Sequence, residues 1–240
     1  MINIISTFYI SNYNSHLDTS RSQELENCLI NNLKSEIIEK IHLFVDNEEA
    51  HKRLIQITNN CDKIVIIEIG KKPKYIDFFN YIFQKLENKI CMITNADIYI
   101  YECKVNLINI LKTKAFVYAL TRYEYDMSCP LIERYQGSHD CYIFNSSFLK
   151  KSVINEHTDF YQNFPGIESH IIKAFCDNGF HPLNPCRQIK IVHYHKTQLR
   201  NHGEWIGLHK SGDDDYFKKS CWCVPPITIT FGENTTPILQ

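Results

Sequence analysis

The chain has 240 residues, a formal net charge of −1 and a hydrophobic fraction of 44%, which are ordinary values for a globular domain. This balance gives no overall field that would attract nucleic acid, so we expect no nucleic-acid partner. No segment approaches the roughly 20 apolar residues of a membrane span, and the N-terminus lacks a signal peptide's basic region. Ten scattered cysteines without a CxxC pair favour reduced thiols and a cytoplasmic location.

The first half of the chain alternates predicted strands and helices. Apolar, β-rich runs predict strands over 2–10, 38–47, 63–69 and 89–95, and the run over 63–69 predicts a buried strand. Helical spacing of apolar residues predicts helices over 20–36, 48–60 and 74–87, the first of them capped by Ser20 or Ser22. The alternation indicates an α/β fold with a largely parallel sheet, in which ligands collect at the carboxyl ends of the strands.

The second half changes character. It predicts strands over 114–126, 139–149 and 187–195, and a helix over 165–180 that follows a Pro-Gly pair. After His202 the sequence becomes irregular. We therefore expect one domain of residues 1–202 and an irregular extension of residues 203–240 that packs on the same domain.

The triplet Asn95-Ala96-Asp97 ends the strand predicted over 89–95. A carboxylate beside a small residue at a strand end suits a hard divalent cation that keeps a phosphate in its shell. A turn in which Asp97 caps backbone amides is the alternative. Tyr9 and Asp46 also lie at carboxyl ends of predicted strands, so we expect them at the same edge of the sheet.

The last predicted strand carries His193 and His195, which are two positions apart and therefore share a face. A neutral imidazole can complete a divalent metal site. Lys196 and Arg200 follow and could neutralise a phosphate leaving group. His195 is the more exposed candidate of the two; one core histidine and one surface histidine is the alternative.

Two acidic residues are candidates for acid–base chemistry. Asp140 stands at the entrance of an apolar strand, and Glu168 stands in the first turn of a predicted helix. Either could accept the proton of an attacking hydroxyl, although Glu168 could equally stabilise the helix N-terminus. We expect Arg122, Glu124 and Asp126 to belong to a polar rim that could touch the donor. Arg21 lies close to the predicted start of its helix, where the helix dipole disfavours a cation, so it could contact an anionic ligand.

The stretches "ITNADIYI", "GSHDCYIF", "PGIESHI" and "NPCRQIKIVHYHKTQLR" occur in a familiar order. Together they resemble the GT-A glycosyltransferases, which use nucleotide-sugar donors. More narrowly, they resemble a glycosyltransferase-like group of large DNA viruses and bacteria, over about residues 1–202. The resemblance implies a GT-A-like fold, with a Rossmann-like nucleotide-binding half and an acceptor-side half. It also implies Mn²⁺ or Mg²⁺ as cofactor and, for a viral protein, a location in the host cytoplasm.

Roles follow from the resemblance by position. Asp97 would be a metal ligand with Asn95 in the place of the first acid of a DXD-like motif, and His195 would be the late ligand. Asp140 would hold the donor sugar, and Glu168 would be the base or a sugar contact. The residues expected to contact the donor are Tyr9, Arg21, Asp46, Tyr75, Asn95, Ala96, Lys196 and Arg200.

Three functions are compatible with these features. The leading hypothesis is metal-dependent transfer of a sugar from a nucleotide-diphosphate-sugar, UDP-sugar favoured, to a glycan or other hydroxyl acceptor, with inversion. The second is a module that binds glycans or nucleotide-sugars without turnover. The third is a metal-dependent phosphoesterase built on His193, His195, Asp97 and Asp140.

Overall fold

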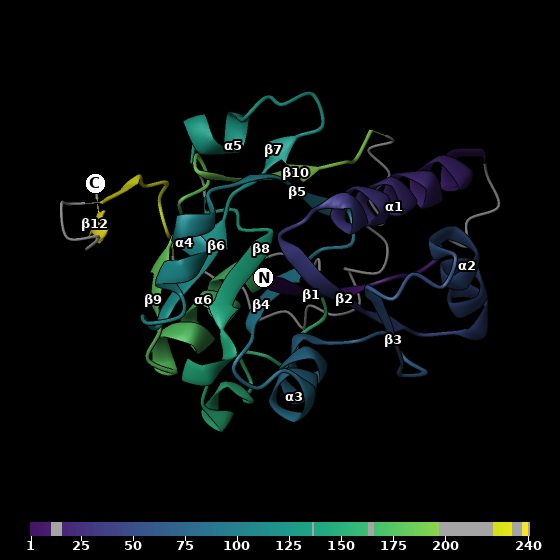
Figure 1. The fold of residues 1–240 in the computed structure, drawn as a ribbon, viewed down its shortest axis with the longest axis horizontal. Coiled ribbons are helices and arrows are strands. Elements are labelled where there is room, and N and C mark those ends of the chain that lie inside the picture. Colours follow the sequence, from purple (N-terminus) through teal and green to yellow (C-terminus); the bar gives the residue numbers. More distant parts are fainter. Residues whose placement is uncertain (11–15, 136, 163–165, 197–222, 232–236, 240) are drawn as a thin grey trace, which may run out of the picture.

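The computed structural model describes residues 1–10, 16–135, 137–162, 166–196, 223–231 and 237–239 (Figure 1). Its helices are α1 (His16–Lys34), α2 (Glu48–Thr58), α3 (Tyr75–Lys85), α4 (Val105–Ile110), α5 (Pro130–Glu133) and α6 (Ile167–Asp177). Its strands are β1 (Ile2–Thr7), β2 (Ile38–Val45), β3 (Ile64–Glu68), β4 (Ile90–Thr94), β5 (Ile98–Cys103), β6 (Phe116–Leu120), β7 (Tyr123–Glu124), β8 (Cys141–Asn145), β9 (His181–Leu183), β10 (Ile189–His193), β11 (Ile229–Phe231) and β12 (Pro237–Leu239).

A seven-stranded sheet forms the centre of the molecule, in the order β3-β2-β1-β4-β8-β6-β9. β3, β2, β1 and β4 run parallel, and β8 is antiparallel to both of its neighbours. Since β6 and β9 are again parallel, the sheet is mostly parallel, which confirms the predicted α/β class.

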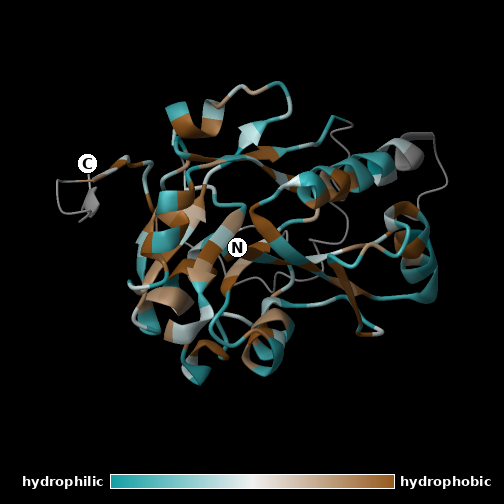
Figure 2. Cartoon of the chain, viewed as in Figure 1, coloured by the Kyte–Doolittle hydropathy of each residue, from teal (hydrophilic) through white to brown (hydrophobic). Residues whose placement is uncertain are grey.

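Helices cover both faces of this sheet, because its strands are apolar on both sides. One core cluster packs the sheet against α3 and α6, and the other packs it against α1, α2, α4 and a second, smaller sheet. Figure 2 shows hydrophobic residues concentrated in the central strands and hydrophilic ones on the outer turns of α1 and α2.

The second sheet has the order β5-β10-β7 and is the element that positions the candidate site. β5 begins directly after the triplet that ends β4, so the chain leaves the large sheet and enters the small one at this point. β10 pairs antiparallel with β5 and places His193 opposite Ile98. β7 pairs parallel with β10 and places Glu124 opposite His193.

The structure corrects two details of the predicted elements. α1 begins at His16, so Ser20 and Ser22 lie inside the helix and neither caps it. The residues before Leu25 are mostly polar, so apolar periodicity does not reveal where the helix begins. β3 was expected to be buried, but it pairs only with β2 at the sheet edge and its residues are half-buried or exposed.

Residues 223–231 pack against the segment between β9 and β10. Asn184 donates to the carbonyl of Val224, and Gln188 exchanges two hydrogen bonds with the backbone of Ile229. The nine cysteines within the described residues are all free. Among the described helices, none is both long and apolar enough to cross a membrane.

Candidate functional site

Asp97 is the central residue of the candidate site. It lies in the turn between β4 and β5, and its carboxylate is buried. The turn is held by backbone hydrogen bonds from Asn95 to the carbonyl of Asp140 and from Ile98 back to Asn95. The backbone N–H of Tyr194 donates to the Asp97 carbonyl at 2.9 Å, which extends the β5–β10 pairing past the end of β10. This pairing brings the end of β10 against Asp97.

Two histidines face Asp97 from that strand end. Nε2 of His193 lies 3.2 Å from Oδ2 of Asp97. The ring of His195 lies edge-on to that of His193, with 5.2 Å between the ring centroids. One potential ligand atom from each of Asp97, His193 and His195 lies within 4.8 Å of the other two. The shared face predicted for the two histidines is therefore present, and both point to Asp97.

The third partner of Asp97 is Arg21 of α1. Its NH2 atom lies 2.6 Å from Oδ2 of Asp97, and its NH1 atom lies 3.0 Å from Oε2 of Glu24. Tyr9, just beyond β1, lies close enough to the guanidinium for the charge of Arg21 to act on the pKa of its hydroxyl. Arg21 and Asp97 are both buried, so this is a charge-assisted contact shielded from solvent.

A chain of charged side chains continues from His193 to Asp140. Nδ1 of His193 lies 3.1 Å from Oε2 of Glu124. Arg122 contacts the other oxygen of Glu124 at 3.1 Å and Oδ1 of Asp140 at 2.8 Å. Since Glu124 accepts from the ring nitrogen that faces away from Asp97, it fixes the orientation of the imidazole. The sequence suggested that Glu124 belongs to a polar rim, but in the structure it is a direct hydrogen-bond partner of His193.

The charges in this cluster shift one another's pKa values. Burial alone would raise the pKa of Asp97, but the hydrogen bond from His193 and the charge of Arg21 outweigh it and hold the pKa well below its usual range. Burial lowers the pKa of His193, yet its hydrogen bonds to Asp97 and Glu124 bring it to about 9. Burial and the charge of Arg21 lower the pKa of His195 to about 4, so His195 is neutral at pH 7.

The donor set of Asp97, His193 and His195 fits a divalent cation, which would take the place of the proton that Nε2 of His193 shares with Asp97. Nε2 of His195 is buried and has no hydrogen-bond partner among the described residues. An unpartnered buried acceptor is costly unless a ligand satisfies it, and a neutral imidazole is a metal ligand. One carboxylate and two imidazoles suit Mn²⁺ and also zinc, so the donor set supports a metal without selecting one.

A second group of polar residues lies around the N-terminal ends of α3 and α6. Burial and the charge of Asp140 raise the pKa of Glu168, in the first turn of α6, to about 7. Burial and the charge of Glu168 raise the pKa of Tyr75, which begins α3. Oδ2 of Asp140 and the hydroxyl of Tyr142 are buried without a partner among the described residues. These groups can receive the hydroxyls of a polar ligand.

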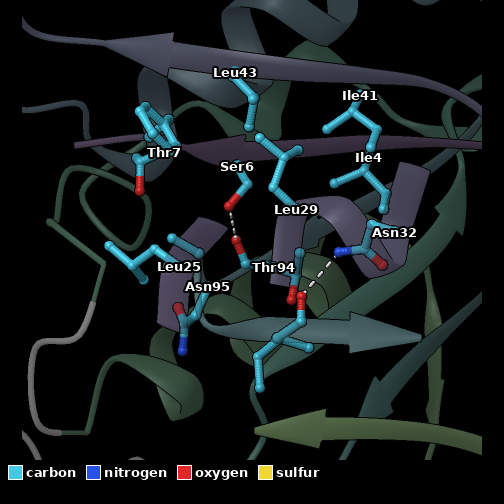
Figure 3. Close-up of a pocket in the computed structure, with 13 residues that line it drawn as sticks. Ile4, Ser6, Thr7, Leu25, Leu29, Asn32, Ile41, Leu43, Thr94 and Asn95 are labelled. Carbon is cyan, nitrogen blue, oxygen red and sulfur yellow. Dashed lines mark hydrogen bonds between the residues drawn. The ribbon is translucent and has the colours of Figure 1, made fainter. Parts of the chain in front are cut away.

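A small cavity lies beneath the triplet, between β1, α1 and the end of β4 (Figure 3). Asn95 and Ala96 line it together with Ser6, which donates to the carbonyl of Thr94 at 2.8 Å. Its volume is about 20 Å³, which is enough for about one water and far too little for a nucleotide. The cavity is a packing gap behind the triplet and is too small to be the donor site.

Asp46 lies in a separate, open hollow at the carboxyl ends of β2 and β3. The hollow has a volume of about 580 Å³ and is also lined by Asn47, Glu48, His51, Lys52, Glu68 and Gly70. That size suits a small-molecule ligand. Asn47 caps α2 by accepting from the N–H of Ala50 at 2.8 Å, and its amide donates to Asp46 at 2.8 Å.

Among the described residues, the buried cluster around Asp97 includes neither of the two further cations predicted to contact the donor, Lys196 and Arg200. Lys196 is exposed, and its ammonium lies over the rings of Tyr125 and Tyr194 at 5.3 and 4.9 Å from their centroids. Its backbone N–H donates to Glu24 at 2.7 Å. Arg200 lies outside the described residues, as do residues 203–222 of the extension. Roles for both cations stay predictions.

Sequence reasoning missed the parts played by Arg122, Glu124 and Tyr142. Glu124 directly follows Tyr123 in a two-residue β7 that pairs with β10. That pairing has no local sequence pattern that would reveal the partner strand. Tyr142 of β8 lies two positions after Asp140, which directly precedes the strand, so period-2 spacing could have placed the two on one face.

This architecture is the GT-A-like fold of nucleotide-sugar transferases, which confirms the predicted fold class. A solved structure that is similar is the mannosyltransferase PcManGT from Pyrobaculum calidifontis in complex with GDP-Man and Mn²⁺, with 11% identity, 84% of this chain covered and a TM-score of 0.51. The chain spans 58% of that protein's length.

Two further solved structures are less similar. One is 4-diphosphocytidyl-2C-methyl-D-erythritol synthase from Anaerococcus prevotii, with 12% identity, 91% of this chain and 94% of that chain covered, and a TM-score of 0.47. The other is residues 1–349 of S. aureus TarS, with 13% identity, 76% of this chain and 57% of that chain covered, and a TM-score of 0.47. No family model matches the sequence, and no curated protein matches it either. The resemblance to a viral and bacterial group stays a prediction.

Proposed function

We propose that the chain is a metal-dependent glycosyltransferase that uses a nucleotide-diphosphate-sugar, with a UDP-sugar favoured, and transfers the sugar to a hydroxyl acceptor with inversion. The observation that carries the proposal is the meeting of Asp97, His193 and His195 at a strand end of a GT-A-like fold. Strand ends of such sheets are where ligands bind. PcManGT, which has the same fold, was solved with GDP-Man and Mn²⁺.

The chain's own residues have separate roles in this reaction. Asp97, His193 and His195 would hold Mn²⁺ or Mg²⁺, which supplies positive charge to the departing diphosphate. Tyr9 and Arg21 lie beside this group, where they can contact the donor. Asp46 lies in the hollow at the next strand ends, where its carboxylate can accept hydrogen bonds from a nucleoside.

Glu168 is the proposed general base and Asp140 the proposed sugar contact. A carboxylate with a pKa near 7 is well matched to accept a proton at neutral pH. The acceptor oxygen forms a bond to the anomeric carbon as the bond from that carbon to the diphosphate oxygen breaks. The hydroxyl proton goes to Glu168, and the nucleoside diphosphate leaves with the electron pair.

The test is release of nucleoside diphosphate from a panel of nucleotide-sugars, with and without Mn²⁺, Mg²⁺ or Zn²⁺. We expect metal-stimulated turnover with one donor and its loss in Asp97→Ala. Asp62→Ala, which removes an exposed carboxylate, is the matched control and should keep full activity. Full activity of Asp97→Ala would refute the assignment of the site. Donor binding without turnover across the whole panel would favour the second candidate, a module that binds nucleotide-sugars; the buried, unpartnered polar atoms of Asp140 and Tyr142 are the observation that favours it.

A further inference from the structure

One oxygen of Asp97 is needed by two different cations. Oδ2 of Asp97 is the oxygen that faces His193, at 3.2 Å, so it is the oxygen a bound metal would share with the histidines. The same Oδ2 lies 2.6 Å from NH2 of Arg21. A guanidinium and a divalent cation cannot both lie against one buried carboxylate oxygen without strong repulsion, because little solvent screens them.

Arg21 has a second anchor that does not involve Asp97. Its NH1 atom lies 3.0 Å from Oε2 of Glu24, one turn further along α1. Oε1 of the same Glu24 accepts from the backbone N–H of Lys196, the residue after His195. NH2 can therefore leave Asp97 while NH1 keeps the guanidinium at the site.

We propose that Arg21 and the metal exclude each other at Asp97, and that the displaced guanidinium binds the diphosphate of the donor. This inference rests on the proposed function. A buried guanidinium that loses its carboxylate needs another anion, and its planar fork matches a phosphate group. Tyr9, whose hydroxyl lies close to Arg21, is at the carboxyl end of β1 on the side where a donor would approach.

The exchange links the binding of metal and of nucleoside diphosphate. Without the diphosphate, the metal must displace Arg21 from Asp97. Of these two carboxylate partners, Arg21 then keeps Glu24. With the diphosphate, the guanidinium has a new anion, so the metal binds more tightly. By reciprocity, the metal tightens the binding of the diphosphate by the same factor.

The experiment measures Mn²⁺ affinity by electron paramagnetic resonance, in the absence of nucleotide, for the full chain and its Arg21→Met and Arg21→Lys variants. We expect Arg21→Met to bind Mn²⁺ about tenfold more tightly or better, since the competing charge is gone. Arg21→Lys keeps the charge and should lie between the two. The matched control is Arg53→Met, which removes an arginine of α2 that pairs with Glu26 of α1, the helix that carries Arg21.

A second arm repeats the titration with UDP. In the wild-type chain, UDP should tighten Mn²⁺ binding, and in Arg21→Met this tightening should be about tenfold smaller. If Arg21→Met is unstable, the increase in Tm caused by Mn²⁺ replaces the titration and should be larger in the variant.

The outcomes separate this inference from the proposed function. Equal Mn²⁺ affinity of the wild-type chain and Arg21→Met would overturn the exchange and leave the transferase proposal standing. Absence of Mn²⁺ binding in every variant would overturn both. The expected shift in affinity, in a protein that turns over no nucleotide-sugar, would support the exchange and refute the transferase.

Discussion

His193 and Asp97 are 96 positions apart in the chain, yet Nε2 of the histidine lies 3.2 Å from Oδ2 of the aspartate. Antiparallel pairing of β5 with β10 produces this contact, because Ile98, the residue after Asp97, lies opposite His193. The contact is thus built on two paired strands, where geometry is more constrained than in a loop. The other ring nitrogen of His193 faces Glu124, so the imidazole is held between two carboxylates.

The first prediction concerns Glu124 as the residue that orients His193. Glu124→Gln keeps the size of the side chain but weakens its acceptance of a hydrogen bond from Nδ1. We expect Mn²⁺ affinity to fall about 10- to 100-fold, the usual effect of losing such an outer partner. Electron paramagnetic resonance titration measures it, and circular dichroism checks that the fold is kept. Glu102→Gln is the control, because Glu102 is exposed on β5 and pairs with Lys190. An unchanged affinity in Glu124→Gln would mean that His193 needs no orienting partner.

The second prediction concerns Asn32, which joins α1 to β5. Its buried side chain donates to the carbonyl of Ile98 at 3.0 Å and accepts from the N–H of Ile100 at 3.1 Å (Figure 3 shows the first bond). Asn32→Ala leaves both backbone groups buried without a partner, which should lower the free energy of unfolding by about 2 kcal/mol or more. Urea denaturation measures it. Asn109→Ala, at an exposed position, should change it by less than about 0.5 kcal/mol.

The first half of the fold could be predicted because its strands and helices carry clear local patterns. β1, β2 and β4 are rich in isoleucine and other apolar residues, and α3 has a strongly one-sided apolar face. β9 and α4 have no such signal. They are short, and their conformation depends on packing against distant segments.

The candidate site was predictable only at its strand ends. Asp97 stands out because it follows an apolar strand of the parallel sheet, whose carboxyl ends meet at one edge. His195 stands out because it lies two positions after His193, just beyond the apolar strand β10. The Arg21–Asp97 pair was not predictable, because it depends on how α1 crosses β5. The link from Glu124 through Arg122 to Asp140 depends in turn on the pairing of β7 with β10, which is tertiary information.

The third prediction concerns the pair of half-buried Arg122 and buried Asp140, whose closest atoms lie 2.8 Å apart. Arg122→Met leaves the buried carboxylate of Asp140 without its cation, so it should lower the free energy of unfolding by about 3 kcal/mol. Asp140→Asn should cost less, because Arg122 keeps its contact with Glu124. The double variant should lose much less than the sum of the two. A double-mutant cycle by urea denaturation measures the coupling. The control is the exposed pair of Lys173 and Asp177, whose coupling should stay below about 0.5 kcal/mol. Additive effects for Arg122 and Asp140 would show that the pair is not coupled.

The last prediction concerns Glu168, whose pKa of about 7 lies above its ordinary 4.5 because of burial and the nearby Asp140. As a base it must be ionised, so the rate of sugar transfer should rise with pH up to about 7 and then level off. Glu168→Gln cannot accept a proton, so kcat should fall about 100-fold or more and the rise should disappear. The pH profile of kcat measures both. Glu156→Gln, at an exposed position, should keep the wild-type profile.

The same raised pKa has a consequence for stability that does not require activity. Between pH 4.5 and 7 the folded chain keeps a proton on Glu168 that the unfolded chain releases. Folding is therefore progressively less favourable as pH rises through this window, and the cost is complete above it. Glutamine resembles the protonated acid, so Glu168→Gln should raise Tm at pH 8 and change it little at pH 4.5. An equal change in Tm at the two pH values would contradict a buried, protonated carboxyl at this position, whatever the profile of kcat.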